Sequence, residues 1–431
     1  MNDAHVRVSV PSRLCRELGR ACVALLISVV LADVAHAEAP ALPDPLRMDD
    51  AVRYARQNRP EVLAARQSAA AASFWPEIVS ALPDPVASTS LDHLPFALHG
   101  ADGSLTLEQS FPLSRERGHR ERAARARASF RAATTERVSL DVELEAMQAF
   151  LMLHEVRRMR EVAASQLQVA RQLVSAAQAR FSAARGAQTE VLRAETEVAR
   201  FEAELRALDA EIAGATAMLN GALGRPPTAA VPALALPEMS STPEAPDALV
   251  ARAVAARPEL GEGRAQLAQA EAEVDVMESM FAPMAMVRGG PAFTMSDGPG
   301  VMLMVGVSIP LWRGKLDAGV SEARAMVRMA EADLDAMSRM IAADVVAAHH
   351  RVAAAEARLD GVRTAVIPRA RQTVDAALSS YGAGFINLVS VIDAAQALWS
   401  AQEQEVHAEV SLHLARASLL RAMGEGVETS P

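Results

Sequence analysis

The pattern of apolar and polar positions predicts two pairs of β-strands, one in each half of the chain. Between residues 104 and 111, polar positions alternate with Leu105, Leu107, Gln109 and Phe111. The alternation returns at 302–309, where the apolar face is formed by Leu303, Val305, Val307 and Ile309. A period of two is typical of a strand with unlike faces. The segments before these strands, 83–91 and 281–289, are about as long as the nine to eleven residues of a membrane-spanning strand.

Four strands are too few to close a barrel. An open sheet edge cannot face lipid, because its backbone groups would have no hydrogen-bond partner there. The pattern therefore predicts that several chains assemble around one barrel.

The segments that follow the strand pairs predict very long helices. Residues 113–225 contain no proline, and residues 311–430 contain only Pro368. A helix over 113–182 would extend about 105 Å. Apolar positions from Val191 to Leu219 step alternately by three and four residues, which is typical of a coiled-coil seam. Gly186 and Gly384 are predicted to end the first helix of each hairpin with a positive φ.

Landmarks in the first half recur 198 residues later and predict an internal duplication. Arg59-Pro60-Glu61 returns as Arg257-Pro258-Glu259, and Gly186 returns as Gly384. Each copy is predicted to hold a short helix (about 47–57 and 245–256), a longer helix, a β-hairpin and a very long helical hairpin. The predicted boundaries are a signal peptide at 1–37, a first repeat at 38–225, a Pro-rich linker at 226–244 and a second repeat at 245–431.

The N-terminus has the pattern of an export signal. Four arginines precede the uncharged run 21–32, and the small-residue site Ala35-His36-Ala37 follows. Cys15 and Cys22 lie within this segment, so the processed chain is expected to have no disulfide and no thiolate metal site. Beyond residue 37 the longest uncharged stretch, 298–312, is too short for a transmembrane helix.

The charge balance and the absence of catalytic motifs exclude other function classes. A net charge of −10, from 43 Lys and Arg against 53 Asp and Glu, disfavours nucleic acid as a partner. The chain carries no P-loop, no H-E-x-x-H and no Gly-x-Ser-x-Gly motif. We therefore expect no enzyme activity and no cofactor.

In the order and spacing of its motifs the chain resembles the TolC-like outer membrane factors, and their heavy-metal efflux branch most closely. The resemblance implies a mixed α+β membrane protein: a homotrimer whose four strands per chain form a twelve-stranded β-barrel in outer-membrane lipid, with a coiled-coil tunnel in the periplasm. It also implies a periplasmic adaptor protein and an inner-membrane pump of the RND type. The matching segments are Arg59-Pro60-Glu61, Ala81-Leu82-Pro83-Asp84-Pro85, Leu94-Pro95, residues 107–113, residues 307–311 and Tyr381-Gly382-Ala383-Gly384.

The same resemblance assigns roles to individual residues. The turns at Gly186 and Gly384 match the family's periplasmic tips, where we expect Arg185 and Phe385 to contact the adaptor and Arg180 to make a tip or gate contact. Asp393 matches an acidic ring at the periplasmic gate. The second acid of that ring is Ser390 in this chain, and by the repeat offset the first-half counterpart of Asp393 is Glu195.

A group of methionines gives a weak indication of the cargo. Strand parity turns Met284, Met286, Met302 and Met304 toward the lumen, and thioethers suit soft ions such as Cu(I). The alternative is that these methionines are flexible apolar packing. The predicted function is export of substrates, heavy-metal cations first, through an outer-membrane channel. The alternatives are multidrug efflux, type I protein secretion or a soluble periplasmic coiled-coil scaffold.

Overall fold

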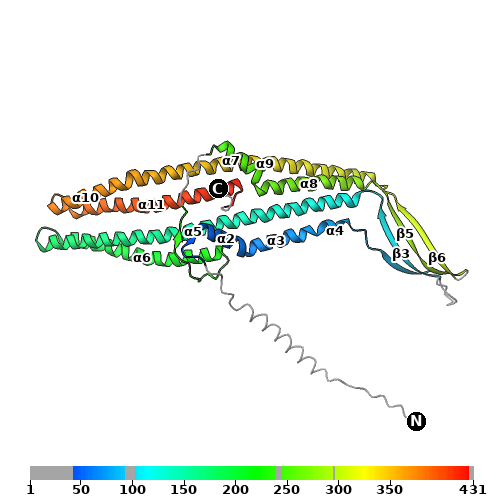
Figure 1. Cartoon of the computed structure of the whole chain (residues 1–431), viewed down its shortest axis with the longest axis horizontal. Coiled ribbons are helices and arrows are strands. Elements are labelled where there is room, and N and C mark those ends of the chain that lie inside the picture. The colour runs from blue at the N-terminus through cyan, green and yellow to red at the C-terminus, as the bar shows by residue number, and fades with distance from the viewer. Residues whose placement is uncertain (1–41, 93–101, 238–243, 295–296, 427–431) are drawn as a thin grey trace, which may run out of the picture.

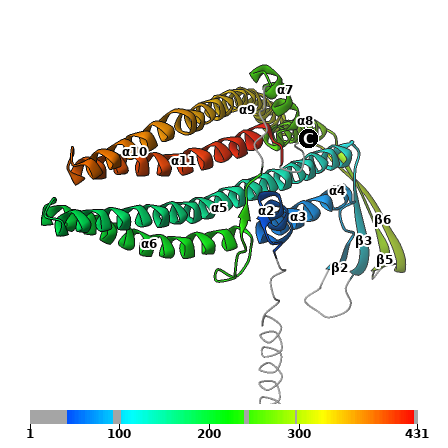
Figure 2. The same ribbon diagram turned by 60° about the vertical axis from the view of Figure 1, so that its left-hand side comes forward.

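Two long helical hairpins run beside each other and meet a four-stranded sheet at one end of the molecule (Figure 1). This computed structural model describes residues 42–92, 102–237, 244–294 and 297–426. The predicted signal peptide 1–37 and both cysteines lie outside these residues. Figure 2 shows that both hairpins turn at the same end, away from the sheet.

The same series of elements occurs in each half of the chain. In the first half it is β1 (Leu46–Arg47), α2 (Met48–Asn58), α3 (Pro60–Ser73), α4 (Trp75–Ser80), β2 (Val86–Asp92), β3 (Asp102–Pro112), α5 (Glu116–Ser182) and α6 (Gln188–Ala222). The second half runs through β4 (Leu234–Ala235), α7 (Pro246–Ala256), α8 (Pro258–Ser279), β5 (Met284–Thr294), β6 (Gly298–Ser308), α9 (Arg313–Gly361), the π-helical turn η1 (Val362–Val366), α10 (Ile367–Ala383) and α11 (Leu388–Met423).

The four strands form one antiparallel sheet in the order β2-β3-β5-β6. The register confirms the predicted parity, because Leu107, Gly289 and Leu303 lie opposite one another on one face. This apolar face is open to solvent in the single chain. Its exposed residues include Leu105, Leu107, Phe111, Val301, Leu303, Val305, Val307 and Ile309. The outer edges of β2 and β6 pair with no other strand among the described residues.

A close approach of two strands explains one glycine in the sheet. A Cβ at Gly290 would lie 2.0 Å from the carbonyl oxygen of Leu105. No side chain fits into that distance, so β5 can approach β3 here only with glycine. The adjacent Pro291 has no N–H to donate to the ladder.

Two predicted helices are interrupted where proline occurs. The longer helix of the first repeat is not continuous, because it breaks at Phe74 and Pro76 falls in the first turn of α4. Proline lacks the N–H for the helical ladder, and its ring collides with the carbonyl four residues earlier. In the second hairpin η1 lies directly before Pro368 and interrupts the helix between α9 and α10. The first hairpin has no such interruption, and α5 runs for 67 residues.

The hairpins are held together by separate apolar clusters along their length. Near the middle of the molecule Phe150 and Leu219 belong to a cluster that Val410 of α11 also joins. Ile341 and Leu412 belong to a second cluster, formed by residues of the second half. Toward the tips the clusters again combine both hairpins. There Phe201 meets Trp399 edge to face, with ring centroids 4.8 Å apart.

The predicted coiled-coil seam of α6 is confirmed. Ala194, Phe201, Leu208 and Ala215 are buried at intervals of seven residues, and Leu219 is fully buried at the end of the seam. The intervening seam positions are half-buried. A three-four spacing keeps one stripe of a helix against its neighbour, which is what α6 achieves against α5.

Two short strands connect the first described residues to the segment between the halves. Strand β4 lies within the predicted Pro-rich linker 226–244 and pairs in parallel with β1.

In the described parts of the chain, no helix has the length and apolarity needed to cross a membrane.

Candidate gate and tip site

The two hairpins reverse direction through the same backbone turn, built from different residues. In the first turn the residue with positive φ is Ala184, at 56°, and in the second it is Gly384, at 84°. In both, the residue after the positive-φ residue donates its backbone N–H to a carbonyl in the last turn of the helix. The Arg185 N–H donates to the Arg180 carbonyl at 2.8 Å, and the Phe385 N–H donates to the Ser380 carbonyl at 2.9 Å. The prediction for Gly384 is confirmed, and the prediction that Gly186 takes a positive φ is wrong.

Gly186 lies instead at a close approach between side chains. A Cβ at this position would lie 3.2 Å from the Cβ of Arg180 and 3.3 Å from the carboxylate of Glu190. Both distances are tighter than ordinary van der Waals contact. Gly186 therefore allows the chain to pass between two side chains that take part in the contacts described below.

The turns also correct the predicted correspondence between the two halves. Ala184 and Gly384 lie 200 residues apart, as do the helix starts Gln188 and Leu388, whereas the Arg-Pro-Glu motifs lie 198 apart. At the tips Asp393 therefore corresponds to Arg193 and not to Glu195. Counted from Pro112 and Pro310, which lie 198 residues apart, the second hairpin has two more residues than the first before its tip, and η1 lies in this stretch.

Three side chains connect the hairpins directly beside the turns. Arg180 of α5 donates to the backbone carbonyl of Tyr381 and lies over the Tyr381 ring, 4.3 Å from its centroid. The Tyr381 hydroxyl donates to Glu190 of α6 at 3.0 Å, and the other oxygen of that carboxylate accepts from the N–H of Leu388 at 3.3 Å. We call Arg180, Tyr381 and Glu190 the tip latch.

The electrostatics of the tip latch favour a neutral tyrosine. The Tyr381 side chain is 2% exposed in a cluster that includes Leu173, Ala194 and Leu388. Burial and the hydrogen bond to the Glu190 carboxylate raise the pKa of Tyr381 to about 12. The hydroxyl therefore remains a donor to Glu190 at every physiological pH.

The predicted gate residues lie on the exposed surface just beyond the turns. Ser390 is part of the N-cap of α11, where its N–H and hydroxyl donate to Asn387 Oδ1 at 3.1 and 3.2 Å. Asp393 and Glu195 are exposed, and neither forms an ion pair or side-chain hydrogen bond with another described residue. The tip latch and Asp393 thus lie in the same few helical turns.

The outermost residues of the tips are unusually apolar for exposed positions. Phe385 is 85% exposed and Phe181 is 48% exposed. Arg185 is exposed beside them. An exposed aromatic side chain next to a cation is typical of a surface that contacts another protein.

The Arg-Pro-Glu motifs hold the ends of the returning helices at the middle of the molecule. Arg59 donates to the carbonyl of Gly221 at the end of α6 at 3.1 Å, and Arg257 donates to that of Ala422 at the end of α11 at 2.9 Å. Carbonyls in the last turn of a helix have no partner within the helix, so each guanidinium satisfies one of them. The motif recurs because both hairpins end against it.

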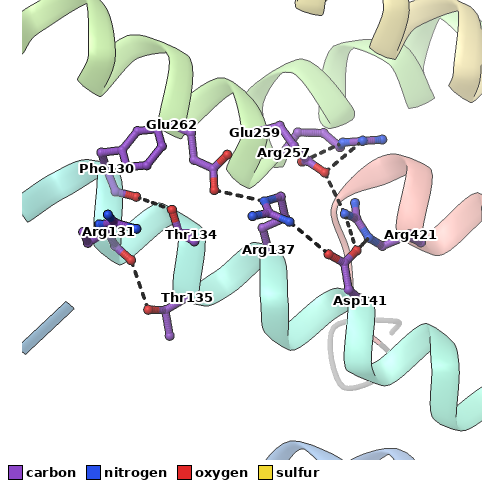
Figure 3. Close-up of polar contacts among 10 residues, drawn as sticks. All are labelled: Phe130, Arg131, Thr134, Thr135, Arg137, Asp141, Arg257, Glu259, Glu262 and Arg421. Atoms are coloured by element: carbon purple, nitrogen blue, oxygen red, sulfur yellow. Dashed lines mark hydrogen bonds and ion pairs between the residues drawn. The ribbon is translucent and has the colours of Figure 1, made fainter. Parts of the chain in front are cut away.

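The site around Arg257 belongs to a larger network of ion pairs than the site around Arg59. Figure 3 shows Glu259 of α8 between Arg257 and Arg421, with Arg421 also reaching Asp141 of α5. The contacts of Arg421 with Glu259 and Asp141 are both 2.7 Å. Burial would raise the pKa of Glu259, but the hydrogen bonds from Arg421 and Arg257 outweigh burial and lower this pKa. This network joins the two repeats.

The opposite face of the sheet from the apolar one is polar. Ser88 and Thr106 are joined across β2 and β3 at 2.9 Å, and Arg288 is paired with Glu108 across β3 and β5. The predicted parity of the methionines is confirmed, since the register places all four on this polar face. They are Met284, Met286, Met302 and Met304.

The methionines are mixed with charged and small residues and do not form a separate patch. Met304 lies opposite Arg288, and Met286 lies opposite Gly306, where a Cβ would come within 2.8 Å of the Met286 methyl carbon. Within the described ranges, no group of three or more His, Cys, Asp or Glu side chains is arranged to hold a metal ion.

Sequence reasoning identified Arg180 and missed its partner Glu190. The contact between Tyr381 and Glu190 joins residues 191 positions apart. One signal was available, because Tyr381 is one of two tyrosines in the whole sequence and lies in the last turn of a helix.

Comparison with known proteins identifies the class of this architecture. Residues 249–425 match the model of the family described as outer membrane efflux protein. The pyoverdine export outer membrane protein OpmQ of Pseudomonas putida strain KT2440 is 28% identical over 212 residues. That match spans 46% of this chain and 42% of the relative, less than half the length of either protein.

Solved structures share the fold over nearly the whole chain. The outer-membrane channel OprN has a TM-score of 0.77 at 19% identity, covering 88% of this chain and 90% of that one. CusC has a TM-score of 0.77 at 14% identity, with coverages of 88% and 92%. The outer membrane protein VceC of Vibrio cholerae has a TM-score of 0.74 at 18% identity, with coverages of 88% and 96%.

These matches agree on one class. The second half of the chain carries the sequence pattern of outer membrane efflux proteins, and the described residues have the fold of solved outer-membrane channels.

Proposed function

We propose, from the match to outer membrane efflux proteins and from the channel fold, that this chain is one subunit of an outer-membrane efflux duct. The observation that carries the proposal is the sheet. It exposes an apolar face, has a polar opposite face and leaves both edges unpaired within the described chain. Unpaired edges are not tolerated in lipid, so strands from other copies must complete the barrel.

In this proposal three chains supply twelve strands, and the helical hairpins extend the channel through the periplasm. Strands β3, β5 and β6 each have 11 residues, which suits a membrane-spanning strand. The apolar face contacts outer-membrane lipid and the polar face lines the lumen. Edge β6 of one chain pairs with edge β2 of the next, which leaves no free edge.

The tips are proposed to form both the periplasmic gate and the docking surface. Asp393 and Ser390 line the entrance, and the tip latch holds the two hairpins of a subunit together beside it. Glu195 stays a gate candidate by position, although Arg193 is the true counterpart of Asp393. Gly186, Gly384, Arg185 and Phe385 present the turns to a periplasmic adaptor, which links the duct to an inner-membrane pump of the RND type.

The assembly is tested by membrane extraction and cross-linking. We expect the processed chain to remain in the membrane pellet after carbonate and high-salt washes, and to give trimers when cysteines introduced on β2 and β6 are oxidised. Release without detergent would favour the soluble coiled-coil scaffold instead. A cysteine pair placed on the adjacent strands β3 and β5 is the matched control, because it must cross-link within one chain.

For the cargo we propose heavy-metal cations, supported by the methionines on the polar face and their suitability for soft ions. A second candidate is an organic siderophore or drug-like compound, which the similarity to a pyoverdine exporter favours. A duct needs no tight binding site for either, because strong binding would slow release.

Growth of a strain lacking the gene, with and without complementation, distinguishes the cargoes. The test compounds are copper, silver, zinc, cobalt, nickel and cadmium salts, together with dyes, antibiotics and a siderophore export assay. Metal-selective sensitivity that the gene restores would support the metal proposal. Sensitivity confined to organic compounds, or loss of siderophore export alone, would replace it with the second candidate.

A further inference from the structure

A band of apolar and cationic residues follows the sheet where its strands lead into the long helices. After β3 the band contains Leu113 and Arg115, and after β6 it contains Leu311, Trp312, Arg313 and Lys315. We call these six residues the collar. Leu113 and Leu311 are equivalent in the two halves, as are Arg115 and Arg313.

The apolar members of the collar are among the most exposed large side chains in the described chain. Trp312 is 82% exposed and Leu311 is 75% exposed. Both follow Ile309 on the same stretch of chain, so the collar is continuous with the apolar face of the sheet. Nothing within the described residues covers this surface.

The cationic members have no partner in the described part of the chain. Arg115, Arg313 and Lys315 are exposed and make no ion pair or side-chain hydrogen bond there. The next arginines along α5 do have partners. These are Arg117 with the Ser80 carbonyl, Arg120 with Glu116, Arg122 with Asp275 and Arg125 with Glu121.

Helix stability does not explain these cations. Arg313 and Lys315 lie in the first turn of α9, which contains no acidic residue. Cations are unfavourable at that end of a helix, because the unpaired N–H groups there already carry positive partial charge. Asp317, the next acid along α9, is exposed and pairs with neither of them. Lys315 is also the single lysine in the sequence.

We propose that the collar binds the headgroups of anionic glycerophospholipids in the membrane leaflet nearest the helices. This rests on the proposed function, in which the apolar face of the sheet lies in the bilayer. Tryptophan favours the level of the headgroups, where its ring is apolar and its N–H remains hydrated. Arg115, Arg313 and Lys315 at the same level attract anionic lipid, and three subunits would present nine such cations around the barrel.

The continuity of apolar face, tryptophan and cations favours lipid over a protein occupant. Along β6 and beyond, exposed aliphatic side chains end at Leu311, Trp312 follows, and the cations come next. This order is that of a bilayer boundary: hydrocarbon, interface and phosphate. A protein surface would not need the three layers in that sequence.

Fluorescence quenching of Trp312 by brominated lipids tests the proposal on the full chain. The protein carries a Trp75→Phe substitution, because Trp75 is 42% exposed, and keeps Trp399, which is 3% exposed in the hairpins and provides an unquenched reference. It is reconstituted in phosphatidylcholine vesicles that contain either brominated phosphatidylglycerol or brominated phosphatidylcholine at the same mole fraction. Trp312→Phe assigns the quenched signal.

We expect stronger quenching by brominated phosphatidylglycerol, by about fivefold in effective local concentration for each cation that contributes. The triple variant Arg115→Ser, Arg313→Ser, Lys315→Ser should lose this preference. Arg358→Ser, Arg369→Ser, Arg371→Ser is the matched control, since these arginines are exposed on the distant helices without side-chain partners in the described chain. It should retain the preference.

The outcomes separate the inference from the proposed function. Equal quenching by the two lipids would overturn the proposed binding of anionic lipid, and it would not contradict the proposed function as a duct. Quenching by neither lipid would contradict the membrane position of the sheet, and with it the proposed function. If the serine variant does not fold, Arg115→Lys with Arg313→Lys should retain the preference, and high salt should reduce it in the unsubstituted protein.

Discussion

The two hairpin turns use nearly the same backbone, but only one of them has the residue that the backbone favours. Gly384 takes its positive φ without a steric penalty, whereas Ala184 adopts the same region at a cost of about 1 kcal/mol. The first turn instead places a glycine at Gly186, where the backbone passes between Arg180 and Glu190. The first turn therefore leaves room for the side chains of the tip latch, and the second turn reverses the chain without backbone strain.

Two similar halves of one fold can therefore carry different tasks. The first hairpin contributes the charged groups Arg180 and Glu190, and the second contributes Tyr381 between them. The two halves also differ by two residues in length between Pro112 or Pro310 and the tip, so corresponding side chains need not lie 198 residues apart. If the latch joins the hairpins, changes on either side should have distinguishable effects.

Truncating the shared tyrosine should have the largest effect. Tyr381→Ala removes a buried aromatic ring, which costs about 3–5 kcal/mol. Tyr381→Phe keeps the ring and removes one hydrogen bond to a half-buried carboxylate, which costs about 1 kcal/mol. Hydrogen exchange of backbone amides in segments 174–194 and 377–394 measures the opening free energy of the tips. Equal protection in both variants would show that the ring does not join the hairpins.

Exchanging the turn residues should have smaller effects of opposite sign. Gly384→Ala should destabilise its turn by about 1–2 kcal/mol, because alanine is disfavoured at φ of 84°. Ala184→Gly should relieve the existing strain and stabilise the first turn by up to about 1 kcal/mol. The same exchange experiment reports both. Destabilisation by Ala184→Gly would mean that the Ala184 conformation is not strained.

Ionisation of Tyr381 should have the smallest effect on stability near neutral pH. The pKa of Tyr381 is raised from 10.0 to about 12, so the neutral form is favoured in the folded state. The contribution to stability is therefore complete below pH 10.0 and lost as the pH rises through about 12. Tyrosinate absorbance in a Tyr54→Phe background isolates Tyr381. Glu190→Gln should move the transition to lower pH, and an unchanged transition would remove Glu190 from the latch.

Much of the fold follows from local patterns in the sequence. The three-four spacing from Val191 to Leu219 predicted which side of α6 is buried, and alternation predicted which faces of β3 and β6 are alike. These features depend on residues only a few positions apart, because the period of a helix or strand determines which side chains share a face. Pro76 gave a sufficient signal for the break before α4, but the prediction did not use it.

The contacts between the hairpins could not be derived in this way. The partner of Tyr381 depends on how one helical hairpin is rotated against the other, and a heptad pattern within a helix does not determine that rotation. The space required at Gly186 depends on the same arrangement, so its glycine was attributed to backbone conformation. The offset between the halves is 198 residues at the Arg-Pro-Glu motifs and 200 residues at the tips. Using 198 throughout therefore gave Glu195 as the counterpart of Asp393, which is wrong.

Conductance in planar lipid bilayers tests most directly whether this chain forms a membrane duct that is gated at its tips. The purified chain and its Tyr381→Phe, Glu190→Gln double variant are compared at equal amounts of inserted protein. We expect discrete conductance steps from both, with larger or longer openings in the variant, because the tip latch no longer joins the hairpins. Inserted trimers that give no steps in either form would contradict this expectation.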